Sequence, residues 1–259
     1  MAARANSDNP GQSTKGYSWR VSYWFGAWHG AWCWARCCRG CAPGPRRARG
    51  DALTGSGDRS HLLSADIRLA THVQDVVATV EAEELADVVL VGHSYAGLVI
   101  TGAADQLLAT NPARIRHLAY VDAVTPQPGE SWSSQHPAET VAARIEAAKA
   151  SGGLSLPPPD ASAFGLAGAN RDWVNRRQTP FPFGVYRDPL AFDAARVARV
   201  PRTFIDCTLP ALPTIAVMRQ RVRSEAGWNV VEIATGHDPM VSEAEKLAAV
   251  LLGCAQPRP

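Results

Sequence analysis

Four short apolar runs, each next to a helical segment, constrain the fold of this chain more than any other feature. The first, DVVLVGHSYAG at 87–97, ends in a glycine turn, and LVITGAADQLLAT continues it with helical character. The others are RIRHLAYVDAV (114–124), RTFIDCT (202–208) and WNVVEIATGHDPM (228–240), the last followed by the helical SEAEKLAAVLLGC. Buried strands that alternate with helices indicate a parallel sheet covered on both faces. We therefore predict an α/β fold with a mostly parallel central sheet flanked by helices.

The chain between these runs changes in character after about residue 125. It contains AETVAARIEAAKA, which has the pattern of an amphipathic helix, then the loop-like SGGLSLPPPD, and then an aromatic-rich stretch. We interpret residues 126–199 as a helical cap inserted over one end of the sheet, with simple surface packing as the alternative. Residues 21–125 and 200–255 then form the core, and residues 1–20 are predicted to be a flexible polar leader.

Charge and composition exclude several classes of partner. The net charge is only +2, so no overall basic field favours nucleic acid. The sequence has no run of 18 or more apolar residues, so no membrane span is predicted. The leader lacks the apolar core of a secretory signal, and the six cysteines form no evenly spaced framework. We expect a reduced, cytoplasmic protein that acts on a small molecule.

The turn after the first apolar run is typical of a nucleophile elbow. Gly92-His93-Ser94-Tyr95-Ala96 follows a strand and opens a helix, which is the context that such an elbow requires. The serine hydroxyl must stand clear of the sheet, so the residues two before and two after it must be small. Gly92 meets this condition, and Ala96 adds one methyl group to the usual glycine. The pattern predicts that Ser94 is a catalytic nucleophile, with a chance match to a short motif as the alternative.

A nucleophilic serine needs a base that takes its proton. Of the seven histidines, His237 is best placed, because it follows the last apolar run and precedes the last helix. A histidine with no role beyond a polar loop is the alternative. His93 adjoins Ser94, but its side chain is expected to point away from the hydroxyl.

Several longer stretches resemble the α/β-hydrolase superfamily, in particular its branch of small esterases and hydroxynitrile lyases. The matching segments are GAWHGAWCW (26–34), LTGSGDRSHLL (53–63), THVQDVV (71–77), VVLVGHSYAGLVITG (88–102), YVDAVTPQPGES (120–131) and TGHDPMVSEAEKLA (235–248). The resemblance implies the α/β-hydrolase fold with a helical cap and a catalytic serine, acid and histidine in that order. It also implies a reaction that needs no metal and no organic cofactor.

The resemblance leaves the catalytic acid open between two aspartates. In much of the family the acid follows the strand here written RTFIDCT, but the residues around Leu209 include no carboxylate. Asp122 ends the strand after the nucleophile helix, where a group of haloalkane dehalogenases carries its acid in a similar context. Asp122 is therefore the first candidate to orient His237. Asp206, inside the RTFIDCT strand, is the second, and a purely structural Asp122 in the following turn is the third alternative.

By the same resemblance, two main-chain N–H groups form an oxyanion hole. One belongs to Tyr95, directly after the nucleophile, and the other to Ala27, in the loop after the first core strand. The family usually has a His-Gly pair before this alanine, whereas this chain has Phe-Gly. Trp28 and His29 are expected to line the pocket for the acyl group.

The stretch CCRGCAPGPRRARGDA at 37–52 interrupts the resemblance. Relatives have a helix and then a strand here, but two prolines and three glycines disfavour a helix, and no apolar alternation supports a strand. The irregular C-x3-C-C-x2-C spacing from Cys33 disfavours a zinc knuckle, and the lack of interleaved aromatic residues disfavours a nucleic-acid arm. The leading hypothesis is a segment out of register with its gene, since compensating frame errors keep the length. Such a segment is expected to impair folding.

Together these features predict a serine hydrolase that cleaves a small carboxylic ester through an acyl-enzyme. Ser94 attacks, His237 transfers the proton and Asp122 orients His237. A hydroxynitrile lyase-like reaction on the same fold is an alternative, but such relatives rely on a lysine in the cap, where this chain has only Lys149. A catalytically impaired binding homologue is the other alternative.

Overall fold

The computed structural model describes residues 20–24, 26–40 and 47–256, so the predicted leader lies, except for its last residue, outside the described residues. Within them six strands form one sheet in the order β2-β1-β3-β4-β7-β8, and every neighbouring pair is parallel. The strands are β1 (Arg20–Trp24), β2 (Arg47–Asp51), β3 (Val88–His93), β4 (Ile115–Val121), β7 (Arg202–Cys207) and β8 (Trp228–Ile233).

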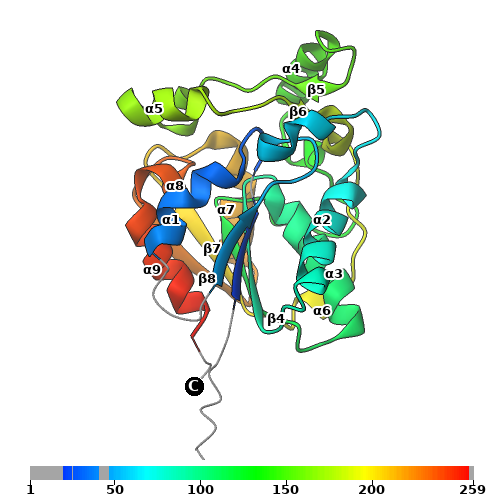
Figure 1. Ribbon diagram of the computed structural model, residues 1–259, viewed down its shortest axis with the longest axis vertical. Helices are drawn as coiled ribbons and strands as arrows, with labels where there is room; N and C mark the ends of the chain where they lie inside the picture. Colours follow the sequence, from blue (N-terminus) through cyan, green and yellow to red (C-terminus); the bar gives the residue numbers. More distant parts are fainter. Residues whose placement is uncertain (1–19, 25, 41–46, 257–259) are drawn as a thin grey trace, which may run out of the picture.

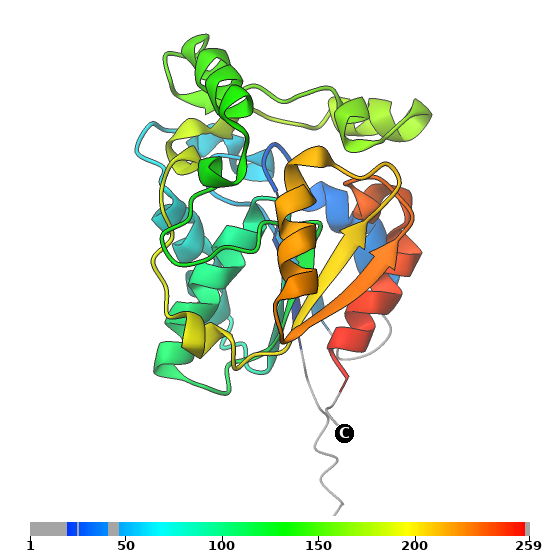
Figure 2. The same ribbon diagram turned by 180° about the vertical axis from the view of Figure 1, so that it is seen from behind.

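Helices cover both faces of this sheet. Figure 1 shows α1 and α9 together on one face and α2 and α3 on the other, and Figure 2 shows α7 in front of β7 and β8. These helices and the short α8 are α1 (Ala35–Gly40), α2 (Leu69–Ala82), α3 (Ala96–Thr110), α7 (Ala216–Ser224), α8 (Pro239–Ser242) and α9 (Ala244–Cys254). The predicted parallel sheet flanked by helices is confirmed.

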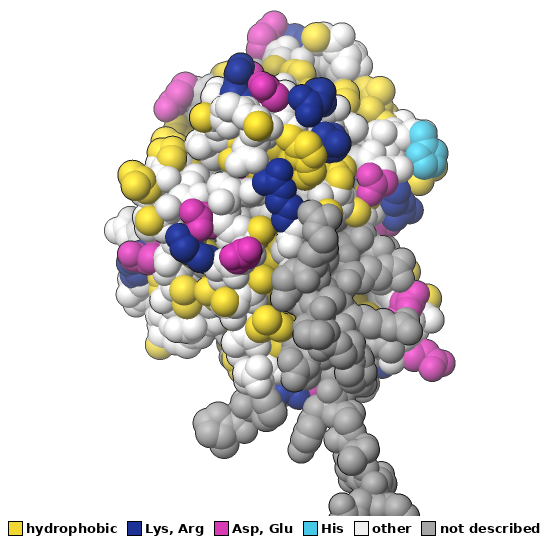
Figure 3. Space-filling model, turned by 60° about the vertical axis from the view of Figure 1, so that its left-hand side comes forward, with side chains coloured by type: hydrophobic (Ala, Val, Ile, Leu, Met, Phe, Trp, Pro, Cys, Tyr) yellow, Lys and Arg dark blue, Asp and Glu magenta, His cyan; other side chains and the backbone are white. Residues whose placement is uncertain are grey.

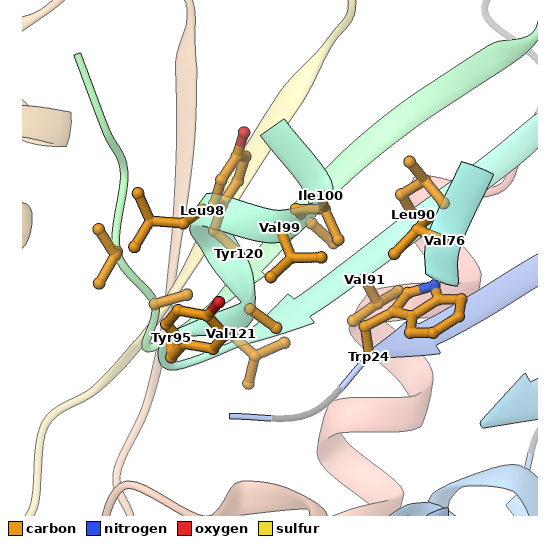
Figure 4. Close-up of a cluster of buried hydrophobic side chains, with 14 of the residues drawn as sticks. Trp24, Val76, Leu90, Val91, Tyr95, Leu98, Val99, Ile100, Tyr120 and Val121 are labelled. Atoms are coloured by element: carbon orange, nitrogen blue, oxygen red, sulfur yellow. The ribbon is translucent and has the colours of Figure 1, made fainter. Parts of the chain in front are cut away.

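The burial of the central strand β3 explains why its sequence is an apolar run. All six of its residues are buried, as expected for a parallel strand covered on both faces. Figure 4 shows part of the surrounding core, to which β1, α2 and β3 contribute the fully buried Trp24, Val76 and Leu90. Burying each such side chain stabilises the fold by about 1.5–3 kcal/mol.

The expectation that residues 37–52 form neither helix nor strand is wrong for the part that the structure describes. Helix α1 extends into this stretch, and β2 pairs in parallel with all five residues of β1. Main-chain hydrogen bonds to a neighbouring strand do not require apolar alternation, so tertiary pairing overrides the weak propensity. Cys41, one ligand of the disfavoured zinc knuckle, lies outside the described residues. The frame-error hypothesis concerns the gene and stays a prediction.

The segment predicted to be a cap contains elements that lie above the carboxyl ends of the strands in Figure 1. These are α4 (Ala138–Lys149), β5 (Ser155–Leu156), α5 (Gly168–Asn175) and β6 (Phe181–Pro182). β5 and β6 pair in antiparallel fashion, and α4 is the helix predicted from AETVAARIEAAKA. The end of the segment returns to the core, where α6 (Ala194–Val197) packs against α3.

The face drawn in Figure 3 has no large patch of side chains of one charge. There, Lys and Arg side chains are interspersed with Asp, Glu and hydrophobic side chains. None of the helices in the described part of the chain is long and apolar enough to cross a bilayer.

Candidate active site

Ser94 stands in a strained turn between β3 and α3. Its φ of +54° is a conformation that residues other than glycine rarely adopt, and it costs on the order of 1–3 kcal/mol. Main-chain hydrogen bonds hold the turn: Ser94 N donates to Val121 O at 3.2 Å, and Ser94 O accepts from Val124 N at 3.0 Å. The elbow is thereby tied to the end of β4.

Small residues around Ser94 are required by close backbone contacts. A Cβ atom added to Gly97 would lie 2.0 Å from the carbonyl oxygen of Val124, and one added to Gly92 would lie 2.7 Å from that of Ala96. Neither contact can be relieved by rotating a side chain, because both partners are backbone atoms. Ala96 itself is fully buried and fits with its methyl group.

His237 contacts one of the two candidate acids and not the other. His237 Nδ1 lies 2.7 Å from Asp122 Oδ2, and both side chains are buried. Asp122 follows β4 directly and has a φ of +41°, so the chain turns sharply as the carboxylate enters the site. Asp206 is also buried, but its carboxylate accepts hydrogen bonds from Arg219 Nε at 2.5 Å and Arg223 Nη2 at 2.7 Å. Of the two aspartates, Asp122 is therefore the partner of His237.

Arg219 on α7 also contacts Asp122. Its Nη2 donates to Asp122 Oδ1 at 2.8 Å, and its Nη1 donates to the carbonyl oxygen of Leu212 at 2.7 Å. The two carboxylate oxygens of Asp122 thus have different partners, Oδ1 on the arginine and Oδ2 on His237, which fixes the plane of the carboxylate. Arg219 was not among the residues predicted from the sequence. The available signal was the spacing of Arg219 and Arg223, which places both on one face of a helix.

His29 lies in a second buried polar group behind the site, which corrects the expectation that it lines the pocket. Its Nδ1 donates to the carbonyl oxygen of Ala27 at 2.8 Å, and its Nε2 lies 3.1 Å from Asp238 Oδ2. His93 Nε2 donates to the carbonyl oxygen of His237 at 2.9 Å. These contacts fix the backbone on both sides of the site.

The charges in this second group follow from burial and pairing. Burial alone would lower the pKa of His29, but the adjacent Asp238 carboxylate outweighs it and raises that pKa above 6.5. Burial likewise opposes ionisation of Asp238, yet His29 and the neighbouring histidines lower its pKa to about 2. For His93, burial and then the nearby His237 hold the pKa well below 6.5, so His93 is neutral at pH 7.

In the described part of the chain, one group of side chains has the residue types and spacing of a metal site. A potential ligand atom from each of His93, His237 and Asp238 lies within 4.8 Å of the others. These groups already have other partners, because His93 bonds to main chain, His237 to Asp122 and Asp238 to His29. The atoms His93 Nδ1 and Asp238 Oδ1 have no hydrogen-bond partner among the described residues.

Ser94 and His237 line one cavity of about 380 Å³, which is also bordered by residues of the segment predicted to be a cap. Trp28, predicted to border the pocket, lines it too, with a φ of +70°. The rest of the wall comes mainly from the cap and from the chain after β7: Trp132, His136, Thr140, Ala143, Arg144, Ala147, Leu156, Pro157, Pro159, Ala163, Phe164, Leu212, Thr214 and Ile215.

Two polar residues of this wall escaped the sequence analysis. Arg144 lies among three aromatic rings, with its Cζ 4.5 Å from the centre of the Trp132 ring, 5.3 Å from Tyr186 and 5.7 Å from Trp28. His136 Nδ1 lies 3.1 Å from the Tyr186 hydroxyl, and burial followed by the charge of Arg144 lowers its pKa to about 3. Nothing in the sequence of an amphipathic helix distinguishes an arginine that faces a cavity from one that faces solvent.

The two residues predicted to form an oxyanion hole lie on either side of the elbow. Tyr95 directly follows Ser94, is fully buried, and has its hydroxyl 3.0 Å from His72 Nδ1. Ala27 follows Gly26, and a Cβ added to Gly26 would lie 2.6 Å from Ser94 Cβ. The loop before Ala27 therefore packs directly on the elbow, although the phenylalanine that replaces the family's histidine lies outside the described residues.

The lysine on which a lyase-like reaction would depend is exposed to solvent. Lys149 ends α4, its side chain is 68% exposed, and its Nζ pairs with Glu146 Oε2 at 2.5 Å. It does not line the cavity that holds Ser94. The structure thus removes the support that Lys149 could give to a hydroxynitrile lyase-like reaction.

Comparisons with known proteins agree with this architecture. Residues 22–250 match the model of the alpha/beta hydrolase family. A carbendazim-hydrolyzing esterase from Nocardioides sp. (strain SG-4G) is 38% identical over 210 residues, which cover 76% of this chain and 85% of the relative. Among solved structures, an extracellular alpha/beta-hydrolase from a Paenibacillus species has a TM-score of 0.80 at 18% identity, covering 92% of this chain and 99% of its own. A pyrethroid hydrolase from Sphingobium faniae JZ-2 has a TM-score of 0.68 at 22% identity, covering 91% and 96%.

Proposed function

The chain belongs to the alpha/beta hydrolase family, as its motifs predicted, and from this premise we propose that it is a serine esterase acting on a small carboxylic ester. The relative that is 38% identical is a carbendazim-hydrolyzing esterase, which supports a hydrolase. One observation carries the proposal: Ser94 and His237 line the same cavity, and His237 Nδ1 lies 2.7 Å from the buried carboxylate of Asp122.

In the proposed first half-reaction, Ser94 Oγ attacks the ester carbonyl while His237 Nε2 takes the hydroxyl proton. Asp122 accepts the hydrogen of His237 Nδ1, which keeps Nε2 free of a proton and stabilises the imidazolium that forms. Collapse of the tetrahedral intermediate expels the alcohol, which receives the proton from His237. The acyl group is left on Ser94.

In the second half-reaction, water attacks the acyl-enzyme with His237 again as the base, and the carboxylic acid leaves. In both steps the carbonyl oxygen becomes an oxyanion, for which we propose the main-chain N–H groups of Tyr95 and Ala27 as donors. The close packing of Gly26 on Ser94 supports this assignment, since it brings the Ala27 loop to the elbow. The reaction requires no cofactor.

The cavity supports a substrate with an apolar or aryl part. Trp28, Trp132 and Phe164 form an aromatic wall, with Trp28 and Trp132 ring centres 6.0 Å apart and Trp28 and Phe164 centres 6.2 Å apart. Aromatic walls bind flat apolar groups through large contact areas. A volume of about 380 Å³ limits the ester to a small molecule.

The test is hydrolysis of 4-nitrophenyl acetate by the purified protein and by a Ser94→Ala variant. We expect the variant to retain less than about one-thousandth of kcat, because a triad without its nucleophile loses most of its catalysis. A fluorophosphonate probe should add one label, found on the Ser94 peptide by mass spectrometry. Equal activity of the two folded proteins, with no label, would refute the proposal and favour a binding homologue.

A further inference from the structure

The catalytic cavity carries one permanent positive charge and no negative one on its described wall. Its titratable lining residues are Arg144, His136 and His237. His136 is neutral at pH 7, since its pKa is about 3. Asp122 sits behind His237, with both its oxygens bonded to other residues. Arg144 therefore sets the sign of the potential inside the cavity.

The charge of Arg144 is incompletely compensated by the protein. No carboxylate of a described residue lies within 4.0 Å of its guanidinium, whereas the largely buried Arg219 and Arg221 each pair with one. Its Nη1 is buried and has no hydrogen-bond partner among the described residues. Stacking on three aromatic rings holds the guanidinium in place, but such contacts recover only part of the hydration that a buried charge loses.

From this geometry we propose that Arg144 binds a carboxylate of the substrate, so that the preferred esters are half-esters of dicarboxylic acids. This inference rests on the proposed esterase function and names its substrate class. A carboxylate supplies two acceptor oxygens to the planar fork of the guanidinium, which a neutral chain of the same length cannot do. The aromatic rings then hold both the arginine and the hydrocarbon part of the substrate.

The experiment compares monomethyl esters of linear dicarboxylic acids, from glutarate to suberate, with methyl esters of monocarboxylic acids of equal carbon number. Hydrolysis is followed by proton release at constant pH. We expect kcat/KM for the best half-ester to exceed that of its neutral counterpart by about 10- to 100-fold, as for a charged hydrogen-bonded pair. In Arg144→Gln that ratio should fall to about one, and Arg144→Lys should restore part of it.

Arg177→Gln is the matched control. Arg177 also lies in the cap and stacks on a tryptophan, with its Cζ 4.7 Å from the Trp173 ring, but it does not line the cavity. Its variant removes the same charge from the protein, so the preference for half-esters should stay unchanged. A loss of preference in both variants would assign the effect to overall charge and overturn the proposal.

Binding to Ser94→Ala separates this inference from the proposed function. Trp28 and Trp132 line the cavity, so quenching of tryptophan fluorescence reports occupation without turnover. Half-esters should bind about tenfold or more tightly than neutral esters, and only while Arg144 is present. Selective binding of half-esters, together with no hydrolysis of any ester by the native protein, would support the inference and refute the proposed esterase function. Hydrolysis of 4-nitrophenyl acetate without any half-ester preference, in turnover or in binding, would refute the inference alone.

Discussion

Replacing Asp122 by asparagine tests the proposed triad most directly, because the surroundings of this residue determine which way the new amide turns. Arg219 Nη2, 2.8 Å from Oδ1, can only donate, so the amide oxygen must take that side. The amide NH2 group then faces His237 Nδ1, across the contact that is 2.7 Å in the native protein. Two donors cannot share that contact, so the proton of the imidazole moves to Nε2. His237 would then hold a proton on the atom that must accept one from Ser94.

The expected loss in kcat is about 10³- to 10⁴-fold, the cost of the wrong histidine tautomer in serine hydrolysis. At about 1.36 kcal/mol per factor of ten, this is roughly 4 to 5.5 kcal/mol of transition-state stabilisation. Steady-state hydrolysis of 4-nitrophenyl acetate measures kcat, and circular dichroism during heating measures the unfolding temperature. The amide keeps the shape and the Arg219 contact of the carboxylate, so activity should fall much further than stability.

Asp206→Asn is the matched control, since Asp206 is also buried and also bonded to Arg219. It does not contact His237, so kcat should stay within about tenfold while the unfolding temperature falls, because the change weakens a buried pair. More than a tenth of wild-type activity in Asp122→Asn, or an equal collapse in Asp206→Asn, would refute the assignment of Asp122.

Two further predictions concern stability. Gly97→Ala should cost more than about 3 kcal/mol in urea unfolding, because its Cβ would lie 2.0 Å from the Val124 carbonyl oxygen. Gly253→Ala, where no atom lies within 4 Å of the new Cβ, should cost nothing, and an equal loss in both would contradict the reasoning. Burial lowers the pKa of His72 to about 4, so unfolded His72 binds a proton near pH 6.5 and the folded residue does not. The free energy of unfolding that it contributes is complete above pH 6.5 and falls by up to about 3 kcal/mol towards pH 4. His72→Gln should remove that part of the acid sensitivity, which parallel urea titrations at pH 7 and 4.5 would detect; an unchanged pH dependence would rule it out.

The sequence sufficed for those parts of the fold that local patterns determine. The apolar runs became β3, β4, β7 and β8. The first three are mostly buried, as expected for central parallel strands, whereas β8 lies at the edge of the sheet and is mostly half-buried or exposed. The elbow was also predictable, since its strand, glycine turn and helix follow one another in the sequence, although Gly97 is required by the distant Val124 carbonyl. Asp122 was found as a candidate because the resemblance includes relatives that carry their acid at the end of the corresponding strand.

What the sequence concealed depends on contacts between distant segments. Arg219 meets Asp122 across 97 positions of sequence, and His29 meets Asp238 across 209. No local pattern reports such a contact, so His29 was placed in the pocket and Arg219 was overlooked. Strand β2 was missed for a related reason, because its pairing with β1 is made by the main chain and leaves no apolar pattern to find.

The position of Asp122, the partner of His237, after β4 has an evolutionary consequence for this chain. With Asp122, directly after β4, as the proposed acid, the loop after β7 carries no proposed catalytic residue. This loop contributes Leu212 to the cavity wall, and the short helical turn that follows it contributes Thr214. Arg219 reaches this loop through the carbonyl oxygen of Leu212, a group that every amino acid provides. Mutations there can therefore accumulate and alter substrate preference while the hydrolytic machinery is inherited intact.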